Sequence, residues 1–227
     1  LGLTADLINP LFLTALLDDF IDTGKVPTSR IAIIESIASR TIDLDTKTRM
    51  LRGNEPFIPY RETLKELTQA FAFDLQVAGV NSFMDTEIVK RFSRADIEML
   101  RHSALIAVSQ NGWQFKNAGS QEYLAALKLS KKSFEEIVSL ISKGEAKRII
   151  QTKWIQTVAS LLSILPSGIL FDQLVQFIAE DKVDFIFQAE PSKFNYEQQK
   201  VLLVRLLTNC ADKYLRITDE RRVARFL

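Results

Sequence analysis

Apolar residues return every three or four positions along most of this chain, the spacing that places them on one face of an α-helix. Asn9-Pro10 predicts the start of the first helix, because Asn caps free N–H groups and Pro fits the first helical position. Gly24 predicts its end, about 14 residues later. A second helix is expected after a Pro-Thr-Ser turn and should pack antiparallel to the first, and the charged residues 43–52 close the pair. We assign residues 1–52 to a small helical domain.

Three further helices are predicted next. A loop with two prolines at 53–59 precedes a helix whose apolar positions keep the helical spacing until Gly79. Two short helices follow at 85–92 and 94–102, and Ser93 is the expected cap of the second.

A β-hairpin is predicted after these helices. Asn111-Gly112 is the favoured dipeptide of a two-residue type I′ turn, and apolar residues alternate with polar or small ones on both sides of it. A turn at these two positions pairs Val108 with Phe115 and places the apolar side chains on one face. A two-stranded hairpin is marginally stable by itself, so it must pack on helices. Helices followed by a hairpin and another helix have the order of a winged-helix domain, which we assign to residues 53–130.

Helical segments are predicted for the rest of the chain, 131–227. The predicted segments are 133–143, 152–164, 168–179, 182–189 and 196–210, with turns at Gly144, at Pro166-Ser167-Gly168 and at Pro191. Their lengths favour stacked helical hairpins of a HEAT-like type, although no motif repeats at a fixed period. The predicted fold class is therefore mainly α: a small helical domain, a winged helix with one β-hairpin, and HEAT-like helical repeats.

Composition and charge limit the classes of protein to which this chain can belong. Lys and Arg number 29 against 28 Asp and Glu, and a net charge of +1 gives no strong overall field for nucleic acid or a membrane. The single cysteine, Cys210, and the single histidine, His102, exclude an internal disulfide and multi-cysteine metal sites and favour a reducing compartment. No apolar run is long enough to span a bilayer, the N-terminus lacks the pattern of a signal peptide, and the first Met is Met50. We expect a cytoplasmic piece of a longer protein.

No motif for catalysis or metal binding is present in the sequence. Gly24-Lys25 is the only Gly-Lys pair, and without a Gly five residues earlier or a following Ser or Thr it cannot form a phosphate-binding P-loop. His102 and Cys210 are far apart, which disfavours a Cys-His catalytic pair, and paired carboxylates occur where solvated helix faces are expected. We assign no catalytic residue and expect that this chain by itself is not an enzyme.

Lys90, Arg91 and Arg94 are the candidate residues for contact with nucleic acid. They lie where a winged-helix DNA binder would hold its recognition elements. Acidic residues interleave with them and weaken the field, whereas phosphate neutralisation needs unpaired positive charge.

Three segments resemble motifs of NACHT-type STAND ATPases. Residues 115–126, FKNAGSQEYLAA, resemble the signature F-x-H-x-(S/T)-F-Q-E-(Y/F)-(L/F)-A-A at the hairpin-to-helix junction of that family's winged-helix domain. Residues 9–16, NPLFLTAL, resemble the segment N-P-L-x-L-x-x-L that opens the family's small helical domain after the nucleotide-binding core. Residues 153–158, KWIQTV, resemble the W-x-(E/Q)-(T/A) helix that opens the HEAT-like region of many prokaryotic members. The resemblance covers nearly the whole chain.

The resemblance implies a regulatory switch rather than an active site. A NACHT core upstream in the same polypeptide would bind ADP or ATP with Mg²⁺, and the small helical and winged-helix domains would clamp that nucleotide in the resting state. Sensing of a ligand that the sequence does not identify would release the clamp for self-association, as in antiviral or innate defence. The resemblance places Pro10 near the nucleotide, and Asn117 stands where the family has a histidine that reaches the phosphates. Asn can donate a hydrogen bond but brings no positive charge, and Ser120 replaces the usual Phe.

A structural role can be predicted without the family resemblance for three residues, Gln121, Glu122 and Tyr123. In the first turn of a helix, Glu122 complements the helix dipole and Gln121 can hydrogen-bond the end of the hairpin, while Tyr123 is expected to bury against the hairpin. We predict all three as domain-junction residues. Two alternatives stay open: a helical-repeat scaffold or adaptor that binds protein partners, and the less favoured winged-helix DNA binder.

Overall fold

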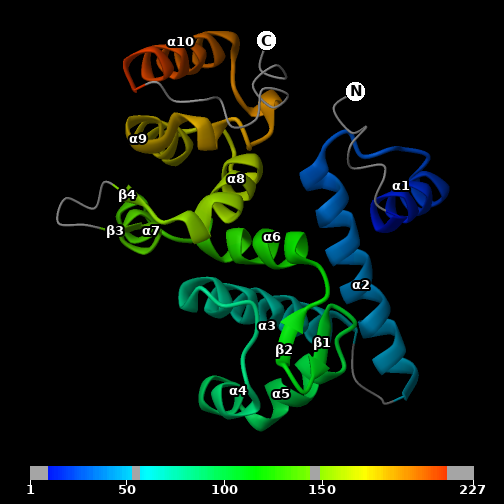
Figure 1. Cartoon of the computed structure of the whole chain (residues 1–227). Helices are drawn as coiled ribbons and strands as arrows, with labels where there is room; N and C mark the ends of the chain where they lie inside the picture. Colours follow the sequence, from blue (N-terminus) through cyan, green and yellow to red (C-terminus); the bar gives the residue numbers. More distant parts are fainter. Residues whose placement is uncertain (1–9, 53–56, 144–148, 214–227) are drawn as a thin grey trace. The chain divides into compact units, whose positions relative to one another are not determined.

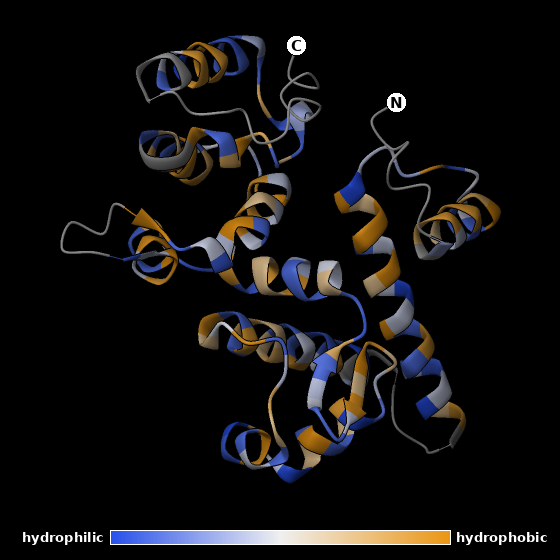
Figure 2. Ribbon diagram, viewed as in Figure 1, coloured by the Kyte–Doolittle hydropathy of each residue, from blue (hydrophilic) through white to orange (hydrophobic). Residues whose placement is uncertain are grey.

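The computed structural model describes residues 10–52, 57–143 and 149–213. These residues form a mainly α-helical protein with one hairpin of four-residue strands, which confirms the predicted fold class (Figure 1). Hydrophobic and hydrophilic residues alternate in bands along the helices, as amphipathic helices require (Figure 2). Contacts between Cα atoms divide the chain into two compact units, the first ending at Lys128 and the second beginning at Leu129. The further division of the first unit after residue 52 stays a prediction.

Helix α1 (Pro10–Thr23) has the 14 residues that the sequence predicts. It ends at Gly24, whose φ of 67° is the left-handed conformation that glycine adopts at helix ends. The predicted cap, Asn9, lies outside the described residues. Phe12, Ala15 and Leu16 form the buried face of the helix.

Helix α2 (Arg30–Arg52) begins after Ser29, whose hydroxyl accepts a hydrogen bond from the N–H of Ala32 at 3.1 Å. It continues through residues 43–52, so the prediction that this charged stretch only closes the helical pair is wrong. Neither Gly nor Pro interrupts the stretch, and Ile42 and Thr46 extend the buried face of the helix into it.

The first two helices cross instead of packing antiparallel as predicted. Figure 1 shows α1 nearly along its axis while α2 lies across the view. Asp19 accepts hydrogen bonds from the Ser36 hydroxyl at 2.6 Å and from Arg40 Nε at 3.0 Å, and Arg40 Nη2 also donates to Asp22 at 2.7 Å. These bonds hold the last two turns of α1 against α2.

The next three helices have the predicted order; they are α3 (Phe57–Ala78), α4 (Asp85–Arg91) and α5 (Arg94–Arg101). Gly79 ends α3 with a φ of 71°. Ser93 caps α5, since its hydroxyl accepts from the Asp96 N–H at 3.2 Å while the Asp96 carboxylate accepts from the Ser93 N–H.

The hairpin strands are β1 (Ile106–Ser109) and β2 (Gly112–Phe115), but the turn is one residue away from its predicted place. Val108 pairs with Trp113 rather than with Phe115, and Ser109 pairs with Gly112. Gly112 is thus the first residue of a strand. Its φ is +100°, and a Cβ there would meet the backbone carbonyl of Phe83. Gly112 is therefore needed for a close approach of two backbones, which a local turn signal does not report.

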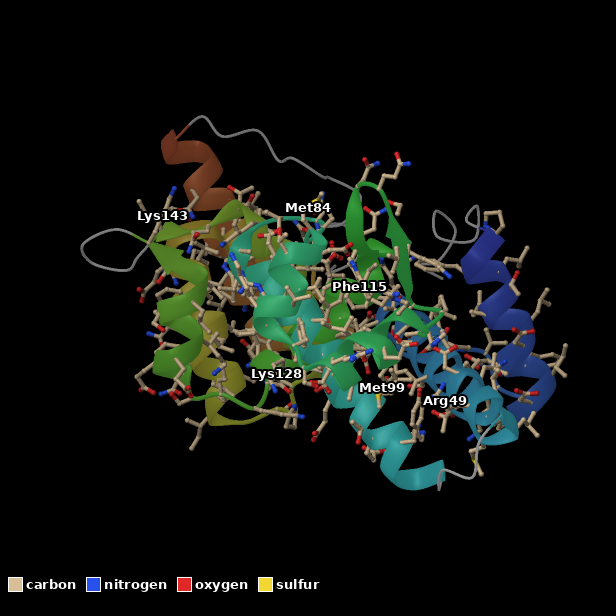
Figure 3. All side chains as sticks on the ribbon, turned by 90° about the horizontal axis from the view of Figure 1, so that it is seen from below. Arg49, Met84, Met99, Phe115, Lys128 and Lys143 are labelled. Atoms are coloured by element: carbon tan, nitrogen blue, oxygen red, sulfur yellow. The ribbon has the colours of Figure 1, made fainter. Side chains whose placement is uncertain are left out.

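Phe83 acts as a short third strand between α3 and α4. Its N–H donates to the carbonyl of Trp113 at 3.1 Å, and its carbonyl accepts from the Trp113 N–H at 2.8 Å. The side chain of Phe83 is fully buried against Phe71, with ring centroids 6.2 Å apart. Phe115 stacks on Phe71 at 5.5 Å and lies in the interior of the first unit (Figure 3). This helix–strand–helix–helix–hairpin order is that of a winged helix, and α6 (Ala118–Leu129) follows it.

The second unit contains the remaining helices and one short strand pair. Its elements are α7 (Phe134–Ile141), β3 (Ser142–Lys143), β4 (Ile149–Ile150), the 3₁₀ turn η2 (Thr152–Trp154), α8 (Ile155–Ile164), α9 (Ile169–Ile186), the 3₁₀ turn η3 (Pro191–Lys193) and α10 (Tyr196–Lys213). Two predictions are corrected. The first predicted helix ends at Ile141 and its last two residues form β3, and the helices expected at 168–179 and 182–189 are the single helix α9. No Gly or Pro separates that pair, and Ile178, Val183 and Ile186 keep one buried face through the junction.

The chain turns back along α9 before α10 begins. Gln198 Nε2 donates to Asp172 Oδ1 at 3.1 Å, which joins the first turns of α10 and α9, and the rings of Phe171 and Phe194 lie 5.4 Å apart. Both helices thus begin at the same end. The connection at this point differs from that of a simple helical hairpin, in which consecutive helices run antiparallel.

Candidate functional site

The first turn of α6 contains most of the residues that the sequence singles out. Asn117 is its cap: Oδ1 accepts from the Ser120 N–H at 3.0 Å, and the Asn117 carbonyl accepts from the Gln121 N–H at 3.2 Å. Oδ1 already accepts this hydrogen bond from the helix, and the Asn117 amide NH₂ can act only as a donor toward a further group. The Ser120 side chain is buried, and its hydroxyl has no hydrogen-bond partner among the described residues.

This turn packs against the start of α2. A Cβ on Gly119 would lie 3.1 Å from Ile34 Cδ1, so the two helices approach at a position where a larger side chain would be crowded. The hydroxyl of Tyr123, a side chain that is only 4% exposed, hydrogen-bonds the Glu35 carboxylate. Burial, followed by the nearby charge of Glu35, raises the pKa of Tyr123. Tyr123 is buried as predicted, and its polar contact is to α2.

Glu122 and Gln121 lie half-buried beside this contact. Burial raises the pKa of Glu122, and the positive charge of Arg30 on α2 partly opposes that rise. The Gln121 side chain forms no hydrogen bond with the described residues, so the predicted bond to the end of the hairpin is not found. We call the contact of Arg30, Ile34 and Glu35 with residues 117–123 the α2–α6 junction.

Asp45 forms a second link between α2 and the winged-helix part, and sequence analysis misses it. Its Oδ2 accepts from the Ala104 N–H at 2.8 Å and from the Ser103 hydroxyl at 3.1 Å, so it binds the loop between α5 and β1. Burial raises the pKa of Asp45 more than these two hydrogen bonds and the charge of Lys116 lower it. The partners lie almost sixty positions away, and a single acid in a charged stretch carries no sequence signal for such a contact.

Pro10 and Asn117 lie at different places in the first unit. Pro10 is the exposed first residue of α1, and its carbonyl accepts from the Thr14 hydroxyl at 2.9 Å. In the described part of the chain, no hydrogen bond joins Pro10 to Asn117.

The remaining candidate residues are placed as follows. Lys90 and Arg91 end α4, Arg94 begins α5, and all three side chains are exposed. His102 is the C-terminal cap residue of α5, as expected for a helix-end histidine, and its Nε2 lies 2.9 Å from Glu98 Oε1. The Cys210 side chain lies outside the described side chains.

Among the described residues, no group of three or more His, Cys, Asp or Glu side chains could hold a metal ion. None of the described helices combines the length and the apolar character needed to cross a membrane. No model of a known protein family matches this sequence, and no curated protein matches it significantly.

Proposed function

We propose that this chain is the regulatory, sensor-proximal part of a NACHT-type STAND ATPase that acts in antiviral or innate defence. The α2–α6 junction is the observation that carries the proposal. The helix that follows the FKN segment packs, through Gly119 and Tyr123, on the helix that follows the NPL segment. The two regions that would clamp a nucleotide are thus joined by a buried contact, as a two-state switch requires.

In this proposal the chain itself has no phosphate-binding loop. ADP or ATP with Mg²⁺ would be held by an upstream NACHT core, and this core and further copies of the protein would be the partners, in the cytoplasm. Asn117 fits a limited role toward such a nucleotide, because its amide NH₂ is available as a neutral donor while Oδ1 caps α6. Pro10 would contact the nucleotide from the start of α1. The junction would transmit release of the clamp to self-association.

The first test is the reading frame upstream of Leu1. A G-x-x-x-x-G-K-(S/T) motif after a predicted strand supports the proposal, and a gene without it overturns the proposal. The second test measures the ADP that stays bound to the purified intact protein. We expect Pro10→Ala, which removes a nucleotide contact, and Tyr123→Phe, which removes the bond to Glu35, each to lower the retained ADP several-fold.

Tyr196→Phe is the matched control for this measurement. It removes the same hydroxyl from a tyrosine that is 75% exposed on α10, so the retained ADP should not change. Equal ADP in all four proteins would contradict the clamp.

One observation favours the alternative of a helical-repeat scaffold. Along α10, Val201, Val204 and Leu207 are each more than half exposed, which is unusual for three apolar side chains on one helix. If no P-loop is encoded upstream, protein binding by the second unit becomes the function to test.

A further inference from the structure

Four cationic side chains on α4 and α5 form no ion pair with the described residues. Lys90, Arg91, Arg94 and Arg101 are exposed, and within the described part of the chain none has a carboxylate oxygen within 4.0 Å of its nitrogens. Arg91 is near enough to the half-buried Asp74 to lower its pKa, an effect smaller than the rise caused by burial. Such unpaired cations are what phosphate neutralisation requires.

The acids that interleave with these cations are engaged elsewhere. Two of them accept from backbone N–H groups at helix starts, one accepts from an indole, and one pairs with a histidine. These contacts are Glu87 with the Met84 N–H at 2.9 Å, Asp96 with the Ser93 N–H at 3.2 Å, Asp85 with Trp113 Nε1, and Glu98 with His102 Nε2 at 2.9 Å. The sequence indicates that these acids weaken the positive field. In the described structure they do so without forming ion pairs with the four basic side chains.

Two of the cations are held over aromatic rings. Arg91 Cζ lies 4.5 Å from the centroid of the Phe83 ring, and Arg101 Cζ lies 5.4 Å from that of Trp113. Phe83 and Trp113 are themselves hydrogen-bonded neighbours in the sheet. Both guanidinium groups are thus ordered before any partner binds, which lowers the entropy cost of binding.

Helix α5 has the position in the chain of a helix that enters the major groove of DNA in helix-turn-helix proteins. Only Phe92 and Ser93 separate it from α4, and the turn of the following hairpin, at Gln110 and Asn111, is exposed. The major groove of B-form DNA admits such a helix, whereas the deep and narrow groove of double-stranded RNA does not.

We propose that the face formed by α4 and α5 binds double-stranded DNA. Lys90 and Arg91 contact phosphates at the end of α4, and Arg94 begins the helix that enters the major groove. Arg94, Glu98 and Arg101 are spaced i, i+4 and i+7 on α5, so they share one side of it. Arg at such a position reads guanine, and Glu can accept from the cytosine amino group. This face does not include the α2–α6 junction, and the proposal does not depend on a nucleotide-driven switch.

The test is fluorescence anisotropy of the full chain with a labelled duplex of about 20 base pairs and mixed sequence. Two phosphates neutralised by Lys90 and Arg91 predict a slope of about −2 in log K against log salt concentration, so affinity should fall roughly 10-fold between about 50 and 200 mM salt. The variant Lys90→Ala/Arg94→Ala removes one phosphate contact and one base contact, so it should weaken binding and make the slope shallower by about one unit. The variant keeps Arg91 and Arg101, the two cations held over Phe83 and Trp113, and circular dichroism verifies that it is folded.

Lys200→Ala/Arg205→Ala, at an exposed and a half-buried position of α10, is the control with the same change of charge. It should leave the affinity and the slope as they are. Three results would each overturn the proposal: no binding at 50 mM salt, equal weakening by the control, or binding of duplex RNA or polyglutamate as tight as that of DNA. The last result would assign the face to acidic polymers in general. Stronger binding to DNA that is lost selectively in Lys90→Ala/Arg94→Ala confirms it.

Discussion

Half-buried carboxylates with raised pKa values are the main residue-scale feature of the first unit. Asp45, Asp74 and Glu122 each lie close to a cation, yet burial has the larger effect on all three. Each native carboxylate holds its proton more tightly than in the unfolded chain. Their ionisation therefore lowers the free energy of unfolding as pH rises through the raised pKa values.

Glu122→Gln should make the first unit more stable at pH 7, because the amide removes a charge that the half-buried site disfavours. The gain should shrink as pH falls toward about 4.3, where Glu122 is protonated in the unfolded chain too. Urea unfolding at pH 7 and near pH 4 measures the change.

Glu136→Gln is the control, and its free energy of unfolding at pH 7 should change in the opposite direction. Hydrogen bonds from the Ser133 N–H and Lys132 lower the pKa of Glu136, so its stabilising effect is present above pH 4.3 and is lost as pH falls through the lowered value. This variant should be less stable than the wild type at pH 7. A gain in both variants, or in neither, would contradict the proposed effect of burial.

At the scale of elements, the helix ends are the best predicted features and the contacts between elements the least. Gly24, Gly79 and Ser93 mark helix ends because capping involves only neighbouring residues. The sequence places the hairpin turn one residue too far along the chain. Glycine is required at position 112 because its backbone lies close to the carbonyl of Phe83, which is distant in the sequence. Tyr123 is predicted at a junction, but its partner Glu35 is not, since nothing local to either residue specifies the other.

Gly112→Ala should destabilise the first unit by about 3 kcal/mol, because it combines a positive φ with a clash against the Phe83 carbonyl. Gly24→Ala isolates the conformational part of this cost, since φ there is also positive and nothing lies within 4 Å of the new Cβ. It should cost about 1 kcal/mol. Similar losses in the two variants, measured by urea unfolding, would show that the close approach to Phe83 has no effect.

At the scale of the whole molecule, the division into two compact units predicts separate local stabilities. In Gly112→Ala, hydrogen exchange should become faster in α3, α6 and the hairpin while α8 and α9 keep their protection. Leu174→Ala, at a fully buried position of α9, should give the reverse pattern. Loss of protection throughout the chain in either variant would mean that the two units unfold as one.

The sequence by itself determined the helical class, most helix boundaries and the helix–hairpin–helix order, because these depend on spacing, caps and turn residues within a few positions. The resemblance of residues 115–126 also placed Asn117 at a hairpin-to-helix junction, and the structure shows it as the cap of α6. Only the tertiary structure decided the hairpin register, the crossing of α1 and α2, and the partners of Asp45 and Tyr123. These depend on the approach of segments far apart in the chain, where burial and backbone contact outweigh any local preference.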